Sequence, residues 1–142
     1  MEFRRVLFRS DLYDPIRMKV SYLSKIFHYI ALTSVNYNID ESHSILHSMN
    51  TLIHASNMLR EEIITRPELK NQTRIIHTAA LLHDMIDRKY VETKPAMLRL
   101  RSHFHEDLTQ NEMNVVEKII TTCSYSKVKQ QGFPRLHIVK AD

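Results

Sequence analysis

Apolar residues recur along this chain at the three- and four-residue spacings that give a helix one apolar face. The first such run follows Asp14-Pro15, an N-cap residue and a proline at the first helical position, and predicts a helix over residues 14–33. After a polar break, a second run predicts a helix that is capped by Asp40 or Ser42 and ends near Ile64. The expected apolar face of this second helix consists of Ile45, Met49, Leu52, Ile53 and Leu59.

Two helices are predicted in the middle of the chain, beyond the interruption at Pro67. The apolar spacing predicts a third helix over residues 73–88. A short fourth helix is expected to begin at the sequence Thr-Lys-Pro of residues 93–95, because proline is favoured in the first turn of a helix.

A fifth helix is predicted to open at Thr109, because Glu112 completes the pattern of a capping box. Residues 136–142 look like the start of a sixth helix that is cut short. The chain has one glycine, which argues against a sandwich or barrel of many short strands. The pattern therefore predicts an all-α fold, a single bundle of about five to six helices that is truncated at its C-terminal end.

The composition adds limits on size and partners. A chain of 142 residues is long enough for one domain with a sizeable core. The net charge is +4, but residues 1–10 contain three arginines and one glutamate and so carry half of it. The remaining +2 is too weak to predict a nucleic-acid partner.

The opening segment EFRRVLFRS, residues 2–10, resembles one reading frame of a common sequencing adapter. We therefore treat residues 1–10 as a non-native leader and exclude them from the functional argument.

Cys123 is the single cysteine, so the chain has no internal disulfide. This favours a reducing compartment, and we expect a cytoplasmic protein. No apolar run approaches the roughly 18 residues of a membrane helix, and we expect no membrane partner.

Nine histidines are the unusual feature of the composition. In the run LLHDMIDRKY, residues 81–90, His83 is expected to border the buried face of the third helix, and Asp84 follows it directly. Histidine with a carboxylate is a suitable mixed ligand set for a divalent cation. The alternative is a core histidine that is hydrogen-bonded to a carbonyl group.

The second predicted helix carries three more histidines on one face. His43, His47 and His54 fall within about 40° of one another around the helix axis. They lie off the apolar face, so two interpretations stay open. The row is either a solvated polar stripe or a source of further metal ligands.

Taken in order, these residues resemble the HD superfamily of metal-dependent phosphohydrolases. His47 looks like the first histidine of that family, His83-Asp84 like its defining pair, and Asp142 like its final aspartate. The pair lies 36 residues after His47, and Asp142 lies 58 residues after Asp84, which is the spacing of the family. The resemblance covers residues 36–142 and includes a Ser-Tyr-Ser element at residues 124–126.

The resemblance implies that residues 11–142 form an HD domain with its metal-binding core in residues 36–142. Its ligands would be His47, His83, Asp84 and Asp142, and they would hold one divalent ion of Mn, Mg, Fe, Co, Ni or Zn. One ion rather than two is expected because Cys123 stands where several members of the family have a histidine. Such an ion would acidify a water molecule and polarise a phosphorus–oxygen bond.

The same resemblance assigns roles around the metal. Asp87 matches an acidic residue that orients the water or shuttles a proton in related nucleotide hydrolases. His43, Arg88 and Lys89 are candidates for binding phosphate oxygens. For Arg88 and Lys89 the alternative is a solvated helix end, where cations are favoured in any case.

The sequence thus predicts a metal-dependent phosphohydrolase that cleaves a phosphate ester of a nucleotide or another small phosphorylated metabolite. Two alternatives stay open. One is an HD domain that binds a nucleotide or metal without turnover, and the other is an oxygenase of the same superfamily with two irons.

Overall fold

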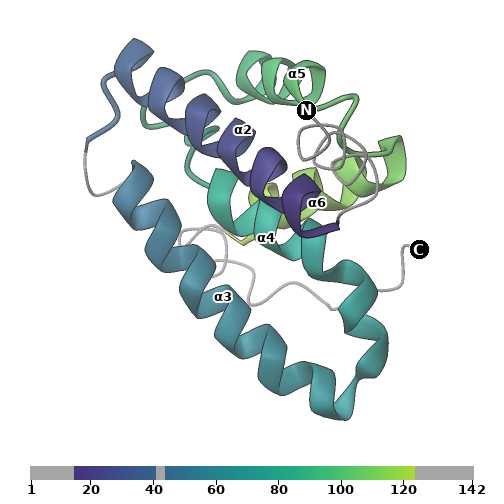
Figure 1. Cartoon of the computed structure of the whole chain (residues 1–142). Coiled ribbons are helices and arrows are strands. Elements are labelled where there is room, and N and C mark those ends of the chain that lie inside the picture. Colours follow the sequence, from purple (N-terminus) through teal and green to yellow (C-terminus); the bar gives the residue numbers. More distant parts are fainter. Residues whose placement is uncertain (1–14, 41–43, 124–142) are drawn as a thin grey trace, which may run out of the picture.

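The computed structural model describes residues 15–40 and 44–123, and all the regular structure in these ranges is helical (Figure 1). The prediction of an all-α fold is confirmed. The elements are α2 (Pro15–Asn36), α3 (Ile45–Thr65), the 3-10 helix η2 (Pro67–Gln72), α4 (Thr73–Leu82), α5 (Thr93–His103) and α6 (Gln110–Thr122). The leader at residues 1–10, His43, the Ser-Tyr-Ser element, the helix expected at residues 136–142 and Asp142 lie outside the described residues.

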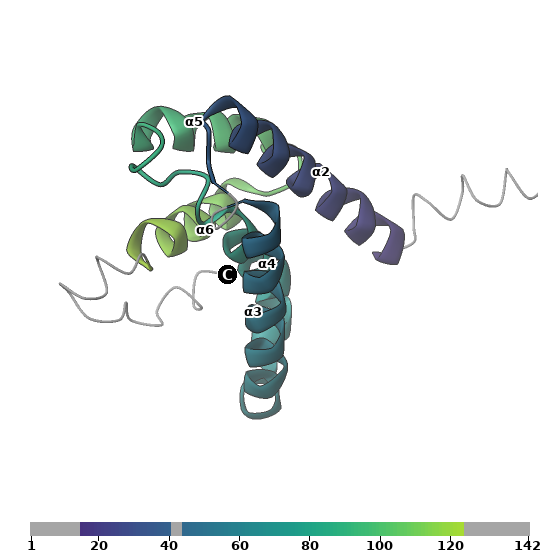
Figure 2. The ribbon, with the colours of Figure 1, turned by 90° about the vertical axis from the view of Figure 1, so that its left-hand side faces the viewer.

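Helices α3 and α4 form an antiparallel hairpin that is closed by η2 (Figure 1). In Figure 2, α3 lies in front of α4, and α2, α5 and α6 gather around the upper end of the hairpin. Helix α4 is central, because it contacts α3 on one side and α6 and α2 on others. Its C-terminal end therefore lies where the hairpin meets the rest of the domain.

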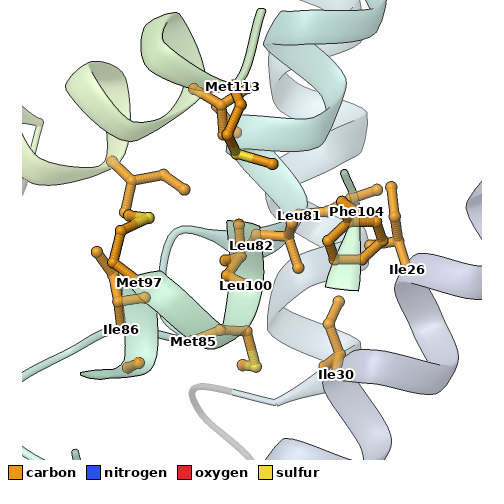
Figure 3. Close-up of a cluster of buried hydrophobic side chains, with 14 of the residues drawn as sticks. Ile26, Ile30, Leu81, Leu82, Met85, Ile86, Met97, Leu100, Phe104 and Met113 are labelled. Carbon is orange, nitrogen blue, oxygen red and sulfur yellow. The ribbon is translucent and has the colours of Figure 1, made fainter. Parts of the chain in front are cut away.

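The hydrophobic core surrounds Phe104, which follows α5 directly and has no exposed surface (Figure 3). Leu81 and Leu82 of α4 and Ile26 of α2 are equally buried around it. The rings of Tyr22 and Tyr29 meet Phe104 edge to face, with centroid distances of 6.1 Å and 5.3 Å. Aromatic pairs favour this arrangement, which places the positive ring edge on the negative ring face.

Polar contacts fix α2 and the α5–α6 connection around α4. The Lys25 ammonium binds the Asp107 carboxylate at 2.6 Å, and Arg74 donates to the backbone carbonyl of Asp107 at 2.5 Å. The Tyr22 hydroxyl lies 2.8 Å from Thr78 Oγ1. Burial raises the pKa of Tyr22, more than its contacts with Thr78 and Arg74 lower it. These contacts link α2 and the α5–α6 connection to α4 and to each other.

Several predicted boundaries agree with the structure. The capping box is present, with the Thr109 side chain accepting from the Glu112 backbone and the Glu112 carboxylate accepting from the Thr109 backbone. Helix α5 begins at Thr93 as expected. Helix α2 continues three residues beyond the predicted end, and Asn38 then takes a left-handed backbone conformation with φ of 51°. Within the described ranges, no helix is both long enough and apolar enough to cross a membrane.

The predicted helix over residues 73–88 is wrong in its last six residues, because α4 ends at Leu82. The imidazole of His83 contacts the Ala80 carbonyl oxygen through Nδ1 at 2.7 Å. A side chain that binds this carbonyl competes with the helical backbone bond to it. Turns follow, with the Met85 backbone N–H bonded to Leu82 at 3.0 Å. His83 and Asp84 therefore lie at a helix end and not within a helix.

The prediction for the second helix is wrong in its cap and in part of its face. Ser44 occupies the N-cap position of α3 and makes no side-chain capping bond. Met49 and Ile53 are 42% and 53% exposed, although Leu59 is buried as expected. The inward face is instead centred on Ser48 and Leu59. The sequence pattern missed this because a serine occupies a fully buried position.

We expect Phe104→Ala to lower the free energy of unfolding by about 3–5 kcal/mol, because it removes a fully buried ring and leaves a cavity in the core. The matched control is Leu98→Ala in α5, where the side chain is 68% exposed. Urea unfolding followed by circular dichroism measures both variants. The control should stay within about 0.5 kcal/mol of the unaltered chain. Equal effects in the two variants would contradict this description of the core.

Candidate metal centre

Three side chains from two segments of the chain converge at the open end of the α3–α4 hairpin. His47 lies in the first turn of α3, while His83 is the C-cap of α4 and Asp84 follows it. The two Nε2 atoms are 3.2 Å apart. Asp84 Oδ2 lies 3.1 Å from His47 Nε2 and 3.3 Å from His83 Nε2. Among the described residues, this is the one group of three or more His, Cys, Asp or Glu side chains that could hold a metal ion.

The helix end orients the His83 ring. Because a carbonyl oxygen only accepts hydrogen bonds, the 2.7 Å contact with Ala80 places a proton on Nδ1. In the neutral ring, Nε2 then carries the lone pair that faces His47 and Asp84. Metal-binding histidines commonly have this arrangement, in which a backbone carbonyl fixes the tautomer and the direction of the ring.

Asp84 is the most buried member of the group, with a side chain 12% exposed. Its Oδ2 atom is buried and has no hydrogen-bond partner within the described part of the chain. Both imidazole nitrogens are within ion-pair distance of this oxygen, but neither contact has hydrogen-bond geometry. Burying a carboxylate oxygen without a hydrogen bond costs free energy. A cation between the three atoms would remove that cost.

The three atoms fit the coordination shell of a divalent cation. A cation about 2.1 Å from each atom would subtend angles of about 95–105° between them, which lie between octahedral and tetrahedral values. The side chains of His47 and His83 are 40% and 32% exposed, so this side of the group is open to solvent. Two imidazole nitrogens and one carboxylate oxygen form a set that suits several first-row transition metals.

The structure does not bring the other predicted site residues into the group of His47, His83 and Asp84. Asp87 is half-buried, and its Oδ1 accepts a hydrogen bond from the Lys89 backbone at 2.9 Å. Arg88 and Lys89 are exposed, and the Lys89 ammonium lies 6.0 Å from the centre of the Tyr90 ring. His54 is exposed and does not belong to the group.

Tyr90 is a neighbour of the group that the sequence pattern did not identify. Its hydroxyl donates to Asp40 Oδ2 at 2.9 Å, which links the segment after α2 to the segment after α4. Partial burial and the contact with Asp40 raise the pKa of Tyr90, and the charges of Asp87 and Asp84 raise it further. The spacing of residues along the sequence could not predict this contact, because Asp40 and Tyr90 are 50 positions apart.

Comparisons of this chain with protein-family models, curated proteins and solved structures find no match. Membership of the HD superfamily therefore stays a resemblance that rests on the order and spacing of the residues themselves.

If the group holds a cation, we expect His47→Ala and His83→Ala each to weaken Co²⁺ or Zn²⁺ binding by about 100-fold or more, since each would remove a ligand and not merely an orienting partner. Isothermal titration calorimetry measures the affinity.

His105→Ala is the matched control for this loss of binding. His105 makes the same local bond as His83, from Nδ1 to the carbonyl three residues earlier, at 2.8 Å. It is exposed and lies outside the group. The control should bind the ion as the unaltered chain does. A loss in His105→Ala as large as in His83→Ala would contradict the assignment.

Proposed function

We propose that this protein is a metal-dependent phosphohydrolase that cleaves a phosphate ester of a nucleotide or another small metabolite. The observation that carries the proposal is that Nε2 of His47, Nε2 of His83 and Oδ2 of Asp84 lie within 3.3 Å of one another. His47 lies 36 positions before the pair His83-Asp84 in the sequence, and all three are residues that the HD resemblance selects as ligands. Asp142, the fourth expected ligand, stays a prediction.

Each residue of the group would contribute in a different way. His47 and His83 would bind the cation through Nε2, and the Ala80 carbonyl would hold the second ring in place. Asp84 would supply the negative charge that a neutral imidazole lacks. The bound cation would supply Lewis acidity toward water and a phosphate oxygen. The exposed sides of both imidazoles leave room for a substrate to approach.

Asp87 would accept a proton from the attacking water. Its Oδ1 already binds the Lys89 backbone, so the second carboxylate oxygen is the candidate acceptor. Arg88 and Lys89 are exposed beside it and would neutralise phosphate charge.

The cytoplasmic location inferred from the single cysteine stays a prediction.

A second candidate is a binding module that holds a metal or nucleotide without turnover. The bond between the Asp87 carboxylate and the Lys89 backbone favours this alternative, because the same bond explains Asp87 as a turn-forming residue. The oxygenase alternative requires two irons per chain. Metal analysis of the purified protein distinguishes it, since our proposal predicts one ion.

The proposal predicts that the full chain, supplied with Mn²⁺, Co²⁺ or Ni²⁺, releases phosphate from members of a panel of nucleotides and sugar phosphates. His83→Ala and Asp84→Ala should abolish this activity by removing ligands, while His105→Ala should keep it. Retained activity in both ligand variants would contradict the proposal. Binding of a nucleotide without phosphate release would support the binding module instead.

The role of Asp87 can be separated from its role in the turn. Asp87→Asn keeps an oxygen that can accept from the Lys89 backbone but removes the base, whereas Asp87→Ala removes both. If Asp87 accepts the proton, both variants should lose about 10²–10⁴-fold in kcat with little change in metal affinity. Near-normal kcat in Asp87→Asn together with a loss in Asp87→Ala would assign Asp87 to the turn alone.

A further inference from the structure

A second polar contact joins α3 to α4, away from the candidate metal centre. Ser56 Oγ lies 3.0 Å from His77 Nε2, and both side chains are half-buried. The contact is side chain to side chain and connects residues on facing helices. Neither residue belongs to the metal-binding group. Neither residue was selected from the sequence, since residues 73–82 contain no Asp, Glu or second His beside His77.

The two polar contacts follow the antiparallel register of the hairpin. His47 meets His83 at the open end, and Ser56 meets His77 nearer the end that η2 closes. Ser56 lies nine residues after His47 and nine residues before Thr65, where α3 ends. Each interval corresponds to about 13 Å along the helix axis. The Ser56–His77 contact therefore sits midway between the closed end of the hairpin and the metal ligand.

Because of this position, a small movement of α3 at Ser56 produces a larger movement at His47. If α3 pivots about the closed end as a rigid rod, a displacement at Ser56 is doubled at His47. A shift of about 0.5 Å at Ser56 would move His47 by about 1 Å, which exceeds the roughly 0.5 Å within which a functional group must be held. A contact that limits motion at Ser56 thus protects the distances in the metal centre.

Apolar packing also holds α3, through the buried Leu59 and through Ile45 and Leu52, which are partly buried against the core. Such packing is non-directional. Ser48 is the other buried residue of α3. The Ser48 hydroxyl has no hydrogen-bond partner within the described residues, so it contributes no directional restraint. The Ser56–His77 contact is directional. It also tolerates either neutral tautomer, since a hydroxyl can donate to or accept from a ring nitrogen.

We propose that Ser56 and His77 are positioning residues, which hold α3 at the register on α4 where His47 meets His83 and Asp84. The inference rests on the metal centre of the proposed function but not on phosphatase activity. It assigns a role to two residues that do not touch the ion or the substrate.

The test compares Ser56→Ala with Ser56→Thr, which keeps the hydroxyl, and with Asn57→Ala, an exposed neighbour on the same helix. Three readouts are taken on the full chain. They are the Co²⁺ affinity, the visible spectrum of bound Co²⁺, and the ¹⁵N shifts of the His47 and His83 rings without metal. Thermal unfolding shows whether each variant is folded.

We expect Ser56→Ala to weaken Co²⁺ binding about tenfold, at the lower end of the range for residues that orient metal ligands. Its Co²⁺ spectrum and its metal-free ring shifts should differ from those of the unaltered chain. Ser56→Thr should restore all three readouts, and Asn57→Ala should leave them unchanged. His77→Phe should reproduce the loss, and adding Ser56→Ala to it should cause no further loss if the two residues act through one contact.

Two results would overturn the inference. One is a Ser56→Ala variant that matches Asn57→Ala in every readout. The other is a loss that Ser56→Thr does not restore, which would assign the effect to packing and not to the hydroxyl. If the unaltered chain fails to bind Co²⁺, the proposed metal centre fails. The metal-free ring shifts would still decide whether Ser56 positions His47.

Discussion

The register of α3 on α4 determines the geometry of the candidate site. His47 belongs to one helix, while His83 and Asp84 follow the end of the other, and the three come within 3.3 Å only because the helices form an antiparallel hairpin. The central position of α4, which also contacts α6 and α2, anchors its half of the site to the hydrophobic core. Helix α3 has fewer buried residues than α4, so its placement depends more on individual contacts.

Asp84 provides the main support for the proposal that this site holds a cation. Asp84 lies in a stretch of the sequence whose residues Leu82, Met85 and Ile86 are buried, and its Oδ2 has no hydrogen-bond partner in the described part of the chain. An isolated buried charge is costly, and proteins normally pair such a group or use it to bind a metal. Two imidazole nitrogens face the oxygen without bonding to it, as ligands of one ion would.

The sequence predicted most of the helices because their apolar spacing and caps are local signals, as at Thr109 and Glu112. It misplaced the end of α4, because the bond from the His83 ring to the Ala80 carbonyl is a side-chain effect that periodicity does not register. His47, His83 and Asp84 were selected through the resemblance to the HD superfamily, because periodicity alone left His47 open between a polar stripe and a ligand. The contacts of Ser56 with His77 and of Tyr90 with Asp40 could not, because they depend on how distant segments pack.

Anomalous diffraction from crystals of the protein soaked with Co²⁺ or Zn²⁺ would show where the ion binds. We expect one strong peak about 2.0–2.3 Å from His47 Nε2, His83 Nε2 and Asp84 Oδ2. A peak elsewhere on the chain would contradict this expectation. So would metal-saturated crystals in which the two imidazoles keep their direct 3.2 Å contact with no ion between them and Asp84.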